Sequence, residues 1–280
     1  MNDIGIAGLT LIIANSLFSL VGFSNSFFFD KYKFSIERIL FHKEYKRLIS
    51  SGFLHVSWMH LIFNMMSLYA FANLLELQIG AAKFTAVYIC SLIGGDLFAL
   101  FVHKNDNNYT AVGASGAVCG IIFASIALFP GIGINFFGLP FSIPGWLYGL
   151  FFVLISIFGI KSKTTNIGHD AHLAGALTGM LVALAFQPQA FIHNYQTILI
   201  IAIPAIAFIA YIYKKPHELL MESFFEKKQE YLYTIEDKYH IEKEFTQNEI
   251  DAILDKISKK GIKSLNNKEK EILDTYSKSI

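Results

Sequence analysis

Four polar side chains of the kinds used in catalysis lie within long apolar stretches of this sequence: His60, Asn64, Ser115 and His172. Placing a polar group in such a stretch costs free energy, so the polar side chains found there usually have a polar partner or a function. A serine hydroxyl is a weak nucleophile until a neighbouring base takes its proton, and a neutral imidazole within hydrogen-bond distance can do so. We therefore predict that Ser115 and His172 form a Ser–His dyad for acyl transfer.

His60 and Asn64 are four residues apart and therefore share one face of a helix. Acyl transfer develops negative charge on the carbonyl oxygen of the substrate, and fixed hydrogen-bond donors stabilise that charge. An imidazole N–H and a side-chain amide are suitable donors. Together with the backbone N–H of Ser115, beside which Gly113 leaves room, they are predicted to form an oxyanion hole.

Small residues follow both members of the predicted dyad at the spacing of one helical turn. Gly116 and Gly120 follow the predicted nucleophile, and Gly175 and Gly179 follow the predicted base. Glycines four residues apart let helix backbones approach closely in lipid. The two helices are therefore predicted to press together beside the residues that would react.

A third catalytic member is not evident from the sequence. Asp170 precedes His172 by two residues, which is about 200° around a helix, so its side chain should point away from the imidazole. Asp96 lies in another apolar stretch, and nothing near it in the sequence connects it to the site. We predict a dyad rather than a triad.

The composition is that of a membrane protein. Of the 280 residues 54% are hydrophobic and 16% are charged, against about 25% charged in soluble domains, and the mean hydropathy is +0.45. A soluble globular protein, a disordered chain and a nucleic-acid binder are thereby excluded. A spanning helix needs roughly 20 apolar residues, and seven stretches qualify or nearly so: about 4–29, 56–77, 82–102, 111–129, 143–160, 168–187 and 196–213. The predicted fold is all-α, a polytopic membrane helix bundle.

Charge divides the chain into two predicted domains. Residues 1–213 form the membrane domain, and residues 214–280, with 13 of the 23 Lys and Arg, form a short charged tail that is predicted to be helical. In the tail, four apolar residues fall on one helix face: Ile250, Ile253, Leu254 and Ile257. Within the membrane domain, the loop at residues 30–55 mixes six basic residues with apolar ones, so it is predicted to lie in the membrane interface.

A metal or haem site is the main alternative use of the histidines. Such a site would draw on His55, His60, His169 and His172. The sequence lacks an HExxH motif, and Ser115 would have no role in this reading. We therefore do not expect a metal or haem site.

Taken together, these motifs resemble those of the rhomboid family of intramembrane serine proteases. The resemblance covers a core of about 45–190 and has four parts: Arg47-Leu48, His55-x4-His60-x3-Asn64, Gly113-Ala114-Ser115-Gly116 and Ala171-His172-x2-Gly175-x3-Gly179. It implies a six-helix core, to which residues 196–213 add one C-terminal span.

The resemblance also implies roles and partners. Ser115 would be the nucleophile, His172 the general base, and His60 and Asn64 the oxyanion donors, with no cofactor. The substrates would be transmembrane segments of other membrane proteins, cleaved within the lipid near the membrane surface. We expect a multi-pass protein of the bacterial cytoplasmic membrane. A catalytically inactive relative that binds transmembrane segments is the alternative, although such relatives typically lack the serine or the histidine.

Two features depart from the family pattern. Cys119 occupies the position, four residues after the nucleophile, where the family has an aromatic residue that packs on the imidazole, so Trp146 or Phe123 would have to stand in. The first, third and fifth loops carry nine Lys and Arg, and the second and fourth carry only Lys83. The positive-inside rule then predicts a cytoplasmic active site, whereas bacterial members open to the outside, and both orientations stay open.

Overall fold

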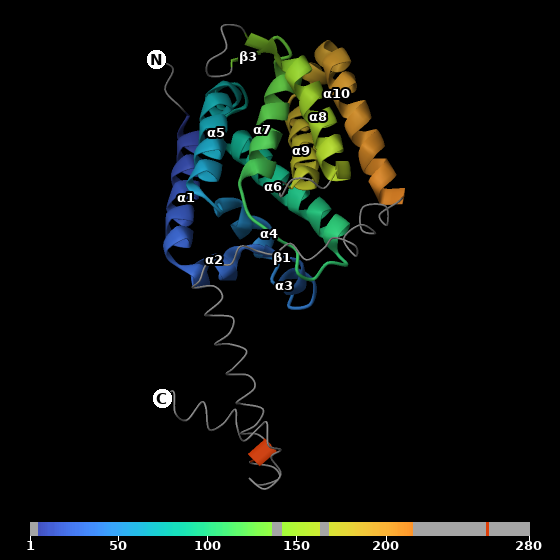
Figure 1. Cartoon of the computed structure of the whole chain (residues 1–280). Helices are drawn as coiled ribbons and strands as arrows, with labels where there is room; N and C mark the ends of the chain where they lie inside the picture. The colour runs from blue at the N-terminus through green and yellow to red at the C-terminus, as the bar shows by residue number, and fades with distance from the viewer. Residues whose placement is uncertain (1–4, 136–141, 163–167, 215–255, 258–280) are drawn as a thin grey trace. The chain divides into compact units, whose positions relative to one another are not determined.

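The structure is a computed structural model that describes residues 5–135, 142–162, 168–214 and 256–257. Each of the seven predicted stretches corresponds to one apolar helix: α1 (Ile6–Ser24), α5 (Trp58–Ile79), α6 (Ala81–His103), α7 (Ser115–Leu128), α8 (Gly145–Ser162), α9 (His169–Phe186) and α10 (Pro188–Lys214). By length and composition α1, α6, α9 and α10 can each cross a membrane. Helix α7 and residues Gly145–Phe158 of α8 are apolar but shorter. The predicted all-α membrane bundle is confirmed (Figure 1).

Short elements fill the first loop. They are α2 (Ser26–Tyr32), β1 (Phe34–Ser35), α3 (Ile36–Leu40), α4 (Arg47–Ser50) and the 3-10 turn η1 (Ser51–Phe53). Strand β1 pairs antiparallel with β2 (Thr110–Ala111), and β3 (Gly133–Asn135) pairs with β4 (Ser142–Pro144). The pairing of β1 with β2 ties the first loop to the segment just before α7 (Figure 1).

Helix α10 begins at Pro188 and not at the predicted residue 196. Two other predicted boundaries differ from the structure for local reasons. The stretch 4–29 breaks at Asn25, whose backbone is extended. The side chain of Asn25 caps α2 by accepting a hydrogen bond from the Phe28 N–H at 2.9 Å. The stretch 111–129 becomes helical only at Ser115, because residues 110–111 are held in β2.

The predicted tail, 214–280, lies outside the described residues except for Lys214 and the pair Lys256–Ile257, which is helical. Its predicted amphipathic helix is thus described only at its last residue, and the division of the chain at residue 213 stays a prediction. The chain divides into two units, and the helix bundle belongs to the first, Met1–Met221.

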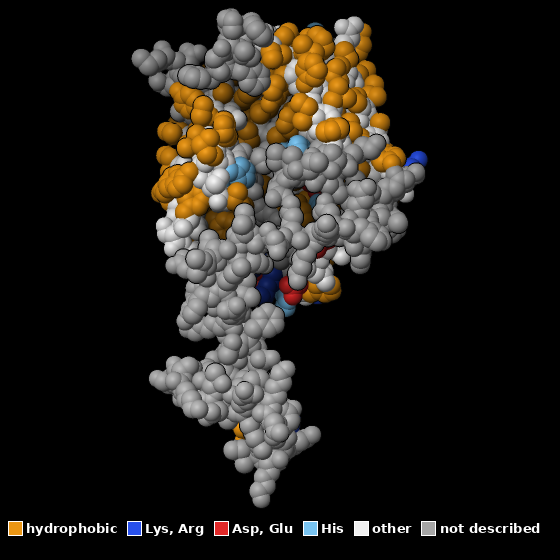
Figure 2. Space-filling model, viewed as in Figure 1, with side chains coloured by type: hydrophobic (Ala, Val, Ile, Leu, Met, Phe, Trp, Pro, Cys, Tyr) orange, Lys and Arg blue, Asp and Glu red, His pale blue; other side chains and the backbone are white. Residues whose placement is uncertain are grey.

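Helix α7 lies inside the bundle. Every residue of α7 after Ser115 is buried, and its neighbours include α5, α6 and α9. The outer helices carry exposed apolar side chains, and Figure 2 shows hydrophobic side chains over much of the described surface in the upper part of the view. The bundle therefore shields α7 with helices and presents an apolar surface to lipid.

Helices α7 and α9 meet backbone to backbone. A Cβ atom added at Gly175 would meet the backbone of Gly116, and one added at Gly179 would meet the backbone of Gly120. Backbone atoms cannot rotate away as a side chain can, so both contacts require glycine. The predicted close approach of the two helices is confirmed, and it brings their N-terminal ends together.

The substitution Gly175→Ala tests this packing. We expect it to push α9 away from α7, to lower the free energy of unfolding by about 1–3 kcal/mol and to separate Ser115 from His172. Thermal unfolding in detergent and a cleavage assay measure the two effects. Gly131→Ala is the matched control, because a Cβ at Gly131 would meet nothing within 4 Å. Equal behaviour of the two variants would contradict the packing argument.

Candidate active site

Ser115 and His172 are in contact. The Nε2 atom of His172 lies 2.5 Å from the Oγ atom of Ser115, in a hydrogen bond between side chains 57 residues apart. Ser115 is the first residue of α7, and His172 lies in the first turn of α9. Both are partly buried. This is the geometry that a base needs in order to take the proton of a hydroxyl nucleophile.

The turn before Ser115 depends on Gly113. Its φ of 136° is a conformation that residues with a side chain rarely adopt, and its N–H donates to the carbonyl of Ser51 at 3.1 Å. A Cβ atom there would lie 2.7 Å from the Cε1 atom of His60 and 3.6 Å from the Oγ atom of Ser115. The absence of a side chain at Gly113 therefore lets the His60 ring approach this turn.

Asn64 is the predicted site residue whose position is least direct. It is buried on α5, and its Nδ2 donates to the carbonyl of His60 within the same helix at 3.0 Å. One of its two amide protons is thus engaged in α5. The Nδ1 atom of His60 is buried and has no hydrogen-bond partner among the described residues. The structure therefore places the His60 ring beside Gly113, two residues before Ser115, and Asn64 one turn further along α5.

His55 supports the same turn from the other side. Its Nδ1 lies 2.8 Å from the Ser19 hydroxyl, which donates to the carbonyl of Phe53, and its Nε2 accepts a long hydrogen bond of 3.5 Å from the N–H of Ala114. Because the hydroxyl donates elsewhere, Nδ1 carries the proton and Nε2 has the free lone pair. This arrangement suits a neutral imidazole.

His55 gives a pH dependence that can be measured. Burial, followed by repulsion from His60, lowers the pKa of His55 from 6.5 to about 3. The unfolded chain therefore binds a proton below pH 6.5 that the folded protein does not bind. The contribution of neutral His55 to the free energy of unfolding is fully present above pH 6.5. It decreases as the pH falls toward 3, by up to about 1.4 kcal/mol per pH unit.

We expect unfolding experiments in detergent between pH 7.5 and 4.5 to show this slope, and His55→Gln to reduce it. His60 lies beside His55, with ring centroids 4.9 Å apart, so His60→Gln serves as the companion variant. An unchanged slope in His55→Gln would show that other groups carry the pH dependence.

The carboxylates considered as third members bond elsewhere. Asp170 lies 3.0 Å from the Nε2 atom of His103 at the end of α6, and the His103 ring stacks on Tyr109 with centroids 3.7 Å apart. Burial raises the pKa of Tyr109, so its phenol stays neutral. Asp96 accepts a hydrogen bond from the Ser51 hydroxyl at 2.9 Å. The Asp170 carboxylate is thus engaged with His103 of α6, and this contact fixes the first turn of α9.

The aromatic neighbour of His172 is not one of the two expected. Phe123 packs edge-on against Phe152, and Trp146 is 38% exposed. The His169 ring lies beside the His172 ring, with centroids 6.2 Å apart. Cys119 is buried in the α7 core. Sequence reasoning assigned His169 only to the metal alternative, and in the part of the chain described here no group of three ligand side chains could hold a metal ion.

Comparison with known proteins identifies the family of this chain. The model of the Rhomboid domain matches residues 42–189, which include all the predicted site residues. This chain belongs to the rhomboid family. The bundle described above is therefore a rhomboid helical membrane bundle, and the protein is an integral membrane protein. A second model, for a family of unknown function, matches residues 233–279.

Several curated proteins are similar to this rhomboid. Rhomboid protein 1, mitochondrial, of Saccharomyces cerevisiae is 31% identical over 157 residues, which is 54% of this chain and 45% of the yeast protein. The putative rhomboid protease YdcA of Bacillus subtilis is 32% identical over 144 residues, 50% of this chain and 66% of YdcA. Rhomboid protease AarA of Providencia stuartii is 30% identical over 155 residues, 49% of this chain and 54% of AarA. The chain thus spans about half the length of most of these relatives.

Proposed function

We propose that this rhomboid is an active intramembrane serine endopeptidase that cleaves transmembrane segments of other membrane proteins. The observation that carries the proposal is the hydrogen bond between His172 Nε2 and Ser115 Oγ, at 2.5 Å. The names of two similar proteins, AarA and the putative YdcA, include rhomboid protease, which supports a protease in preference to an inactive relative.

In the proposed reaction His172 takes the proton of Ser115 as Oγ attacks the scissile carbonyl carbon. The tetrahedral intermediate collapses to an acyl-enzyme when His172 returns that proton to the leaving amine. Water, deprotonated by His172, then releases the new carboxylate and restores Ser115. The protein supplies the nucleophile and the base, so the proposed chemistry requires no cofactor.

The N-terminus of α7 favours the oxyanion. The first N–H groups of a helix have no partner within the helix, and the helix dipole is positive at this end. In α7 the first hydrogen bond within the helix runs from the N–H of Val118 to the carbonyl of Ala114. The N–H of Ser115 comes before this bond and is one of the N–H groups without a partner in the helix. We propose that this N–H, the His60 ring and the second amide proton of Asn64 stabilise the oxyanion, in space that Gly113 leaves open.

A fluorophosphonate reagent tests the proposal directly. The Ser115 oxygen would displace fluoride from phosphorus and His172 would take its proton, so intact-mass analysis of the folded chain should show one covalent adduct at Ser115. The His172→Ala variant should label far more slowly. A folded protein that neither labels nor cleaves would favour the alternative, a catalytically inactive rhomboid-like protein that binds transmembrane segments.

The choice of membrane is part of the proposal. The sequence suggested a bacterial cytoplasmic membrane, but similar proteins come from mitochondria as well as from bacteria. Membrane fractionation of the source cell decides between them. A reporter fused after residue 280 then identifies the side on which the tail lies and, because α1 and α5–α10 would give seven spans, the side of the loops around Ser115.

A further inference from the structure

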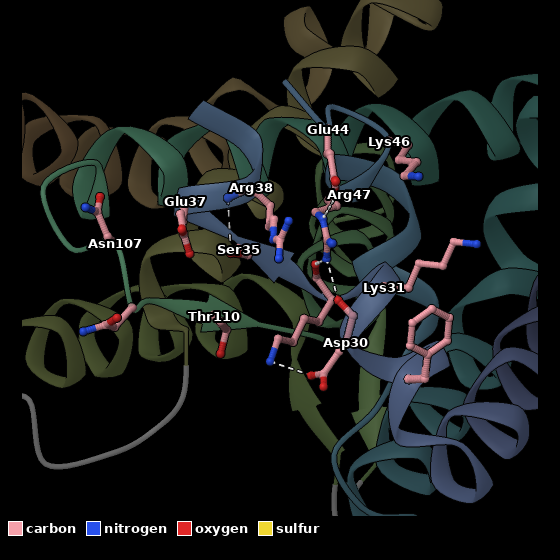
Figure 3. Close-up of a pocket in the computed structure, with 13 residues that line it drawn as sticks. Asp30, Lys31, Ser35, Glu37, Arg38, Glu44, Lys46, Arg47, Asn107 and Thr110 are labelled. Carbon is pink, nitrogen blue, oxygen red and sulfur yellow. Dashed lines mark hydrogen bonds and ion pairs between the residues drawn. The ribbon is translucent and has the colours of Figure 1, made fainter. Parts of the chain in front are cut away.

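A polar hollow of about 610 Å³ opens on the first loop, away from the dyad. Its walls come from α2, β1, α3, α4 and the segment that leads into β2 (Figure 3). The basic residues that line it are Lys31, Lys33, Arg38, Lys46 and Arg47, and the acidic ones are Asp30, Glu37 and Glu44. The proposed proteolysis assigns no role to this hollow.

Ion pairing leaves an excess of positive charge in the hollow. Lys33 pairs with Asp30 at 2.7 Å, and Arg47 pairs with Glu44 at 2.6 Å. The other charged lining residues form no salt bridge within the described parts of the chain, and they are Lys31, Arg38, Lys46 and Glu37. Three cations therefore face a single anion.

Arg47 is held in place before any ligand arrives. It is 5% exposed, its Nε donates to Glu44, and its Nη1 donates to the carbonyls of Asp30 and Lys33 at 2.8 and 2.7 Å. The Nη2 group keeps two donors that make no hydrogen bond to any described residue. A guanidinium that is already fixed loses little freedom on binding, and its planar donors match the oxygens of a phosphate.

A second guanidinium faces the same space. Figure 3 shows Arg38 and Arg47 turned toward the middle of the hollow, with Lys31 and Lys46 toward its edge. Arg38 also contributes, with Arg47 as the main cause, to holding the pKa of Glu44 below its ordinary value. Two guanidinium groups around one space repel each other, and an anion between them removes that repulsion.

The surroundings of the hollow indicate where such an anion would come from. Phe27 lines it and is 76% exposed, and Phe41 and Tyr45 of the same loop are 66% and 59% exposed. Large apolar and aromatic side chains beside basic ones are typical of a segment in the headgroup region of a membrane. Basic pockets at that level bind anionic lipid headgroups.

We propose that this hollow binds the phosphate of an anionic phospholipid, through the guanidinium groups of Arg38 and Arg47 with Lys31 and Lys46 at the edge. The acyl chains of the lipid would lie along the exposed apolar residues of the first loop. The proposal concerns binding alone, so it stands or falls independently of the proteolytic activity.

Titration of the full chain in detergent tests it, with native mass spectrometry as the readout. The probes are phosphatidylglycerol and phosphatidylcholine with the same acyl chains, and inorganic phosphate. We expect phosphatidylglycerol to bind at least roughly fivefold more tightly than phosphatidylcholine, since one basic side chain near the surface contributes about that factor. Equal binding of the two lipids would overturn the proposal, as would binding of inorganic phosphate with no preference between them.

Variants of opposite sign locate the site. Arg38→Gln should weaken phosphatidylglycerol binding roughly fivefold, and Glu37→Gln should strengthen it by a similar factor. Both residues are exposed, so both variants should fold. Lys83→Gln, which removes a positive charge at the other end of α6, is the matched control and should change nothing. Equal loss in Arg38→Gln and Lys83→Gln, or no gain in Glu37→Gln, would overturn the assignment to this hollow.

Discussion

Ser115→Ala is expected to abolish cleavage of a transmembrane substrate while the protein stays folded and inserted. Loss of the nucleophile in a serine protease lowers turnover on the order of 10⁶-fold, and His172→Ala should have an effect of similar size. Because the two residues act as a unit, the double variant should be little worse than either single one. Cleavage in liposomes, with thermal unfolding of the same preparation, measures both quantities.

The chain offers matched controls for this experiment. Ser125 lies on the same helix, is buried, and donates to the carbonyl of Ile121 at 2.8 Å. His193 is exposed on α10 and bonds to the carbonyl of Gln189. Ser125→Ala and His193→Ala should keep nearly normal turnover. Substantial turnover in Ser115→Ala would remove this residue from the mechanism.

Asn64→Ala and His60→Ala are expected to lower turnover by about 10²–10³ each, as the loss of one oxyanion donor does in other acyl-transfer enzymes. Substrate binding should change less, because the charge on the oxygen exists only in the transition state. Among the described residues, the side-chain hydrogen bond of Asn64 stays within its own helix, so its removal should cost little stability. Turnover, substrate binding and melting temperature, measured together, separate catalysis from packing.

Asn73→Ala provides the comparison on the same helix, nine residues further along α5. It removes the same amide at a distance from Ser115, so turnover should be close to normal. If Asn64→Ala instead lowers the melting temperature while turnover per folded molecule is unchanged, Asn64 is a packing residue. The oxyanion would then rest on the N–H of Ser115 and on His60.

The helices and the meeting of α7 with α9 could be predicted because their signals are local. Apolar runs of spanning length predict helices, and glycines one turn apart predict close packing. The start of α7 at Ser115 could not be predicted, because it depends on the pairing of Ser35 with Thr110 across 75 residues. The contact of Asp170 with His103 is also long-range, and no periodicity connects its two partners.

The polar hollow was missed for a related reason. The sequence predicts that its basic residues belong to an interfacial loop, but it does not show which of them form ion pairs. Asp30 pairs with Lys33 and Glu44 pairs with Arg47. Glu37 and Arg38 are neighbours in the sequence, yet they form no ion pair with each other in the described part of the chain. Which charged side chains are left without an ion pair depends on side-chain geometry and not on composition.

The shortness and burial of α7 bear on how the protein is made. Its 14 residues span about 21 Å, less than the roughly 30 Å of a hydrocarbon core. Emerging from the ribosome before α9 exists, α7 has no glycine face to pack against and is too short to span lipid by itself. Its stable insertion must therefore wait for later helices, so a chain truncated before His169 should be cleared by membrane quality-control proteases, even though its first helices are intact.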